Sequence, residues 1–208
     1  ISSFENCNSL EIINITGFDK SSMKSMNKLF YQTPRLNKIH FEELNTKNVE
    51  DMSYLFSYSG LSNIDNFLSL DTTNVKNMSH MFYFSSIETL DVSLFKTNNL
   101  IDMSYMFSGL EIVSIDLSNL ITNKVVNMSG LFFLTRYLIK INFKNFDTSN
   151  VKDMSNMFGL CEDLVNLDLS SFNTKNVVNM ESMFNGCYSL DFLDLSNFDT
   201  SNVQNMNG

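Results

Sequence analysis

One short pattern decides the organisation of this sequence, and a clear copy of it reads Asn176-Val177-Val178-Asn179-Met180-Glu181-Ser182-Met183-Phe184. The methionine at its fifth place, which we call the anchor methionine, recurs every 25 or 26 residues, and phenylalanine follows four residues after seven of the anchors. The anchor methionines are Met26, Met52, Met78, Met103, Met128, Met154, Met180 and Met206. The chain is therefore a tandem array of about eight repeats, and the repeat must determine the fold.

Each repeat has two halves with different apolar periods. The stretch 190–196 ends in an alternation of apolar and polar residues, which is typical of a half-buried strand. The stretch around the anchor places apolar residues at i, i+3, i+6 and i+7, which predicts one stripe of a short helix, with Asn173 and Thr174 as cap candidates. Parallel strands are expected near residues 13–15, 39–41, 65–67, 90–92, 115–117, 141–143, 167–169 and 193–195.

Neither half can bury its apolar face alone, so equivalent halves must stack on one another. The phenylalanine four residues after the anchor is then expected to stack on its counterpart in the next coil and to form a ladder. The expected fold is an α/β solenoid, a leucine-rich-repeat-like right-handed coil with one parallel β-sheet and a row of short helices. Residues 1–208 are expected to form a single repeat domain of about eight coils of 25–26 residues, truncated at both ends. Apolar residues near the ends then predict end-to-end self-association, namely Leu10, Ile13, Ile15, Leu193 and Leu195.

Composition excludes several classes of protein. The chain has 208 residues, of which 43% are hydrophobic and 18% are charged, so it is globular in character. Twenty-three acidic residues outweigh 14 basic ones, and the net charge of −9 disfavours a nucleic-acid partner. No run of about 18 apolar residues is present, so nothing in the chain is expected to span a membrane.

The repeats resemble those of a known family of surface proteins. Residues 190–206 and 146–154, together with the turn Asn185-Gly186-Cys187, are similar to the BspA-like leucine-rich-repeat surface proteins, and most of all to their mycoplasma-type subgroup. The resemblance covers essentially the whole chain. It implies a cell-surface or secreted protein that serves adhesion and partner binding rather than catalysis, with any signal peptide or lipid anchor outside this sequence.

Two sets of residues leave alternatives open. Cys7, Cys161 and Cys187 occupy equivalent positions and could form a buried ladder of small residues, a disulfide between the last two, or part of a metal site. A row of outward acids on the strands could be a solvated face, or could bind Ca²⁺ or a cationic partner. These acids are Asp91, Asp116, Asp168 and Asp194.

No catalytic constellation is visible. His40 and His80 lie in different halves of their repeats, and neither has a nucleophile and an orienting acid at an interpretable spacing. We therefore expect no enzymatic activity and no cofactor.

The expected function is a surface module that binds an extracellular protein or glycan through its exposed sheet face, where outward side chains vary between coils. The alternative is a structural stalk that projects another domain and has no ligand of its own. Basic residues near 136–144 form a positive strip bordered by acids, which could orient an anionic group or be ordinary surface. The candidate partner-binding residues are Lys38, His40, Glu42, Asp116, Lys140, Asn142, Lys144, Asp168, Phe192 and Asp194.

Overall fold

The computed structural model describes residues 3–16, 22–42, 44–63 and 70–208. The strands in these ranges are β1 (Ile12–Thr16), β2 (Lys38–Glu42), β3 (Ser114–Asp116) and β4 (Lys140–Asn142). Strand β1 pairs in parallel with β2, and β3 pairs in parallel with β4. The register aligns Ile13 with Ile39 and Ile115 with Ile141, so equivalent positions of neighbouring repeats lie side by side.

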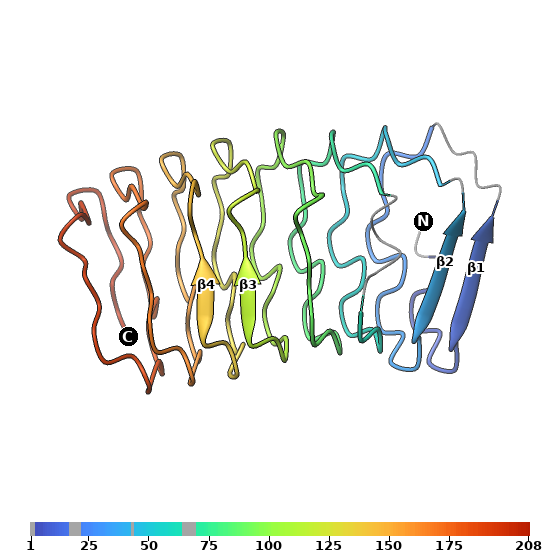
Figure 1. Ribbon diagram of the computed structural model, residues 1–208. Helices are drawn as coiled ribbons and strands as arrows, with labels where there is room; N and C mark the ends of the chain where they lie inside the picture. The colour runs from blue at the N-terminus through green and yellow to red at the C-terminus, as the bar shows by residue number, and fades with distance from the viewer. Residues whose placement is uncertain (1–2, 17–21, 43, 64–69) are drawn as a thin grey trace.

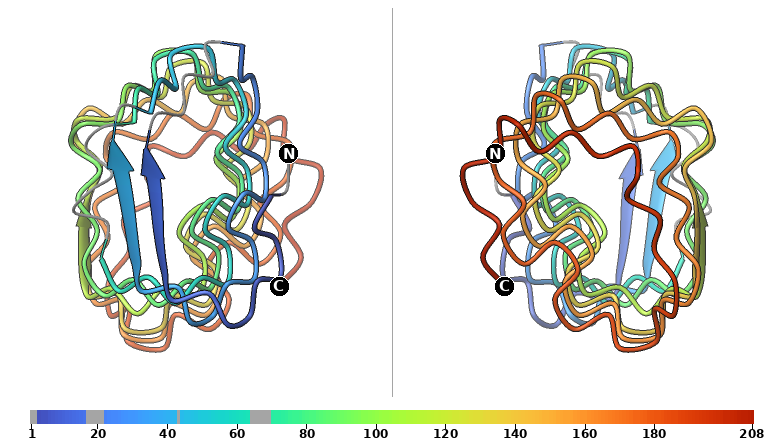
Figure 2. Two further views of the ribbon diagram at one scale, coloured as in Figure 1. Left: turned by 90° about the vertical axis from the view of Figure 1, so that its right-hand side faces the viewer. Right: turned by 90° about the vertical axis from the view of Figure 1, so that its left-hand side faces the viewer.

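A second parallel ladder runs along the stack at the residue before each anchor methionine. Single bridges join, in order, Ser25, Asp51, Asn77, Asp102, Asn127, Asp153, Asn179 and Asn205. Because each bridge joins positions one repeat apart, each repeat forms one coil that lies against the next (Figure 1). Figure 2 looks along the stack and shows the coils overlying one another, with β1 and β2 in one wall.

The segment from each anchor methionine to the sixth residue after it, which we call the turn segment, is built from successive β-turns. In one coil, the N–H groups of Met103, Tyr105 and Phe107 donate to carbonyls of the next coil at 2.9–3.1 Å. The N–H groups between them close turns within the coil, as in the 3.3 Å bond from Met106 to the carbonyl of Met103. Tyr105 and Gly109 have φ values of 54° and 69°, in the left-handed region. Alternate N–H groups therefore point along the stack, whereas an α-helix directs all of them within itself.

The predicted α/β solenoid with a row of helices is wrong. No helix occurs in the described residues, and their strands form two small two-stranded sheets instead of one. The spacing of the apolar residues suggested a helix because side chains that point inward from successive turns have a similar spacing. Met103, Met106 and Phe107 point inward in this way and are at most 1% exposed. Asn173 and Thr174 therefore cap no helix. The predictions near 90–92, 167–169 and 193–195 are not strands, and the one near 65–67 lies outside the described residues.

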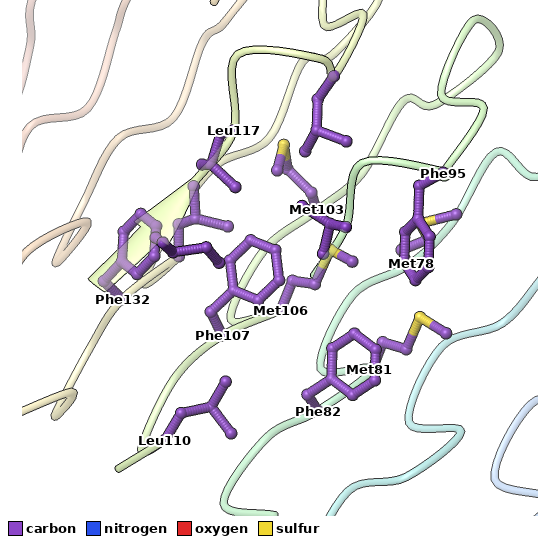
Figure 3. Packing of buried hydrophobic residues seen from close by; sticks show 14 of the residues in the cluster. Met78, Met81, Phe82, Phe95, Met103, Met106, Phe107, Leu110, Leu117 and Phe132 are labelled. Atoms are coloured by element: carbon purple, nitrogen blue, oxygen red, sulfur yellow. The ribbon is translucent and has the colours of Figure 1, made fainter. Parts of the chain in front are cut away.

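The core between the walls is a continuous ladder of phenylalanines and methionines. Consecutive phenylalanine rings from Phe4 to Phe184 lie 5.5–6.3 Å apart between centroids, with their planes within 23° of parallel. Figure 3 shows Phe82, Phe107 and Phe132 in this row, with methionine side chains packed around them. The phenylalanine ladder predicted from the repeat is confirmed, and the flexible thioethers fill the space beside the rings.

Buried threonines tie neighbouring coils together through the backbone. The hydroxyl of Thr122, which is 1% exposed, donates to the carbonyl of Asp147 at 2.8 Å and accepts from its N–H at 2.8 Å. Thr148 makes the same two bonds to the next coil at Asn173. Each of these hydroxyls therefore satisfies one N–H and one carbonyl group in the backbone of the next coil.

Candidate binding surface

A shallow groove of about 810 Å³ lies over β3 and β4 on the outer side of the wall that contains the strands, which we call the strand face. Strand β4 directs Lys140 and Asn142 outward, because Ile141 between them is buried in the core. The groove brings together five of the residues predicted from the sequence, which are Asp116, Lys140, Asn142, Lys144 and Asp168.

The carboxylates that border the groove are held by hydrogen bonds from neighbouring serines. The hydroxyl and the N–H of Ser118 donate to Asp116, the N–H at 2.8 Å, and the side-chain amide of Asn142 donates at 3.1 Å. Together these bonds lower the pKa of Asp116 below its ordinary value. Ser170 lowers the pKa of Asp168 in the same way. Both acids therefore stay ionised, and each accepts the bonds that close the turn after it.

The two lysines of the groove have no carboxylate partner among the described residues. The ion pairs among the described residues lie outside the groove, and they join Lys76 to Glu50, Lys96 to Asp71, and Arg136 to Glu162. Lys140 and Lys144 are both exposed, on either side of Asn142. The groove thus presents two ammonium groups to solvent in a chain whose net charge is −9.

The remaining predicted residues lie apart from this groove. Phe192 and Asp194 line a smaller adjoining groove of about 360 Å³, which shares Asp168 with the first. Lys38, His40 and Glu42 belong to β2, which lies several coils away along the stack (Figure 1). The ten predicted residues therefore form two neighbouring clusters and one distant set.

The cysteines and the acids give no metal centre in the described structure. Cys7, Cys161 and Cys187 are free thiols, and the thiol of Cys161 donates to the carbonyl of Phe132 at 3.1 Å. Burial raises the pKa of the Cys161 and Cys187 thiols, so both stay protonated. No group of three His, Cys, Asp or Glu side chains that could hold a metal ion occurs in the part of the chain that the structure describes.

The family comparison agrees with the repeat organisation. A family model described as "Mycoplasma protein of unknown function, DUF285" matches residues 1–119, 58–144 and 127–208. The chain belongs to the DUF285 family. No curated protein and no solved structure matches it. Within the described residues, this DUF285 chain contains no helix long and apolar enough to cross a membrane.

The DUF285 chain has a second distinctive surface that the sequence reasoning missed, on the wall opposite the strands. Aromatic rings of the turn segments contact one another there, namely Tyr31, Tyr54, Tyr58, His80, Tyr83, Phe84, Tyr105 and Phe133. His80 is stacked between Tyr54 and Tyr105, with centroids 4.3 and 4.9 Å away, and burial lowers its pKa. Burial also raises the pKa of Tyr83 to about 12.

Two glycines take the place of an aromatic residue in the coil that follows it: Gly109 follows Phe84, and Gly130 follows Tyr105. A Cβ atom on Gly109 would lie 2.6–2.7 Å from ring atoms of Phe84, and one on Gly130 would lie 2.5 Å from Cδ1 and Cζ of Tyr105. Each ring therefore lies flat on the backbone of the next coil. Aromatic residues at the second and sixth places after the anchor, followed one coil later by glycine at 130 and 109, were the signal in the sequence.

Proposed function

We propose that this chain is a recognition module that binds an anionic group on an external protein or glycan through the strand-face groove over β3 and β4. The observation that carries the proposal is the pair of exposed ammonium groups at Lys140 and Lys144, which have no carboxylate partner among the described residues. Charge-assisted hydrogen bonds from such groups are roughly twice as strong as neutral ones. Asn142 and the serines that line the groove supply further donors and acceptors.

The division of labour within the repeat supports a binding role. Anchor methionines recur in all eight repeats, and the phenylalanine after them and the threonine before them recur in seven each, so these positions maintain the stack, whereas the outward strand positions differ from coil to coil. At the place occupied by Lys140, for example, other coils have Ile12, Lys38, Ser114 and Phe192. A constant scaffold with a variable face is how repeat proteins acquire specific partners.

The resemblance to the BspA-like leucine-rich-repeat proteins supports the same role and a position at the cell surface or outside the cell. Membership of DUF285, a repeat family, is compatible with this resemblance. The proposal assigns the chain no catalytic activity.

The test compares the parent chain with the Lys140→Ser/Lys144→Ser double variant, using immobilised extracellular-matrix proteins and sulfated glycans as probes. We expect the parent to bind at least one probe with an affinity that falls as salt is added, because exposed charges are screened. The double variant should keep the parent's circular dichroism spectrum and lose the binding. Lys152→Ser/Lys175→Ser, which removes two exposed lysines elsewhere, is the matched control and should bind like the parent.

Equal binding by the parent and the Lys140→Ser/Lys144→Ser variant would remove the groove from the proposal. A parent chain that binds none of the probes would favour the structural stalk.

A further inference from the structure

A row of exposed aliphatic side chains lies next in the chain to residues of the two grooves, immediately before Ser114 of β3, Lys140 of β4 and Asn166. Val113, Ile139 and Val165 occupy equivalent places in three consecutive coils and are 53%, 45% and 36% exposed. The N–H of Ile139 donates to the carbonyl of Val113 at 2.9 Å, which joins the first two coils at this point. Exposed apolar residues in register on neighbouring coils form a continuous patch, unlike single ones scattered over a surface.

The aliphatic row is confined to the coils that form the groove. Other coils place exposed polar residues at the equivalent position, namely Glu11, Asn37, Glu88 and Asp191. The row therefore does not serve the scaffold, because coils without it stack in the same way. Its position next to Lys140 in the chain gives the surface two chemical halves, one apolar and one cationic.

We infer that the partner is an acidic segment of a protein that also carries aliphatic side chains; this inference rests on the proposed function and names the partner class. Its carboxylates would neutralise the ammonium groups of Lys140 and Lys144, which have no carboxylate partner among the described residues of this acidic chain. Its aliphatic side chains would cover Val113, Ile139 and Val165. A sulfated glycan would satisfy the two lysines but would leave the aliphatic row facing water.

The experiment measures dissociation constants for three probes on the parent chain. The probes are a synthetic peptide of Glu and Leu residues, the same peptide with every Leu replaced by Ser, and heparin. We expect the Leu peptide to bind roughly tenfold more tightly than the Ser peptide, which is what partial burial of two aliphatic side chains contributes.

Variants then assign that difference to the row. Val113→Ser/Ile139→Ser should remove the preference for the Leu peptide, while Lys140→Ser/Lys144→Ser should weaken both peptides and heparin. Ile101→Ser, which changes an aliphatic residue that is also 45% exposed but lies elsewhere, should behave as the parent. The circular dichroism spectrum of each variant checks that it is folded.

The outcomes separate the inference from the proposed function. If the parent binds heparin through the two lysines but binds both peptides equally, the groove is a binding site and its assignment to an acidic, aliphatic protein segment is wrong. If the preference for the Leu peptide persists in Val113→Ser/Ile139→Ser, the row takes no part in binding. A parent that binds none of the three probes overturns both.

Discussion

Replacing Gly130 by alanine should be among the most damaging single-methyl additions to this chain. Gly130 has φ +58°, and the ring of Tyr105 from the preceding coil lies flat against it. A Cβ atom there would come within 2.5 Å of ring atoms, a distance that forces the ring to move.

The expected cost has two parts. A left-handed conformation costs an alanine about 1–2 kcal/mol relative to glycine. Displacing a packed ring to make room costs about 1–3 kcal/mol more, as overpacking does in protein cores. Gly130→Ala should therefore lower the free energy of unfolding by about 2–5 kcal/mol. The equivalent residues Tyr54 and His80 have φ 56° and carry side chains, so the left-handed backbone alone does not exclude a Cβ atom. At Gly130, the ring of Tyr105 occupies the place where that atom would lie.

A double-mutant cycle in urea, followed by circular dichroism, measures the second part directly. In the Tyr105→Ser background the ring is gone, so Gly130→Ala should cost only about 1–2 kcal/mol. Gly159→Ala is the matched control: this glycine has no left-handed φ, and its added methyl would lie 3.1 Å from Phe133 Cδ2, so the loss should stay below about 1 kcal/mol. Equal losses for Gly130→Ala in both backgrounds would refute the account of the ring on the backbone.

Three further predictions concern the coils themselves. Phe107→Ala should destabilise by about 3–5 kcal/mol because it opens a cavity in the buried ladder, while Ser118→Ala at the surface should change the urea midpoint little. Thr122→Val should cost about 1–3 kcal/mol, since it leaves the part-buried N–H and carbonyl of Asp147 in the next coil without their partner; Thr122→Ser should restore most of the stability. The lowered pKa of Asp116 contributes stability that is present above the ordinary aspartate pKa of about 4 and is lost as pH falls through the lowered value, so Asp116→Asn should flatten the pH dependence of unfolding below about pH 4. An unchanged acid limb in Asp116→Asn would mean that the serine bonds do not favour the ionised form.

The repeat was predictable from the sequence, and the form of each coil was not. The phenylalanine ladder followed from the register alone, because identical residues one repeat apart must lie side by side in a stack. The helix prediction failed because Met103, Met106 and Phe107 have the spacing of a helical stripe and equally that of side chains pointing inward from successive turns. Glycine at 109 and 130 indicated left-handed positions, which interrupt a helix, but most equivalent positions hold other residues.

The candidate groove was partly visible in the sequence. The alternation of apolar and polar residues around Ile141 predicted that Lys140 and Asn142 point outward, and the structure confirms this orientation. The groove residues lie apart from Phe192 and from β2 because they belong to different coils. The order of the coils along the stack follows from the sequence. The aliphatic row was not predicted, because Ile139 precedes the strand, where alternation no longer says which side chains face water.

The positions of the groove and of the aromatic wall both depend on turn segments whose alternate N–H groups bond to the next coil. Scalar couplings across hydrogen bonds, measured by long-range HNCO spectroscopy on the isotope-labelled chain, report the partner of each N–H directly. The structure predicts a coupling from the amide of Phe107 to the carbonyl of Leu131, joined by a 3.0 Å bond. A coupling from Phe107 to the carbonyl of Met103, four residues earlier in the same coil, would show a helix and contradict this structure.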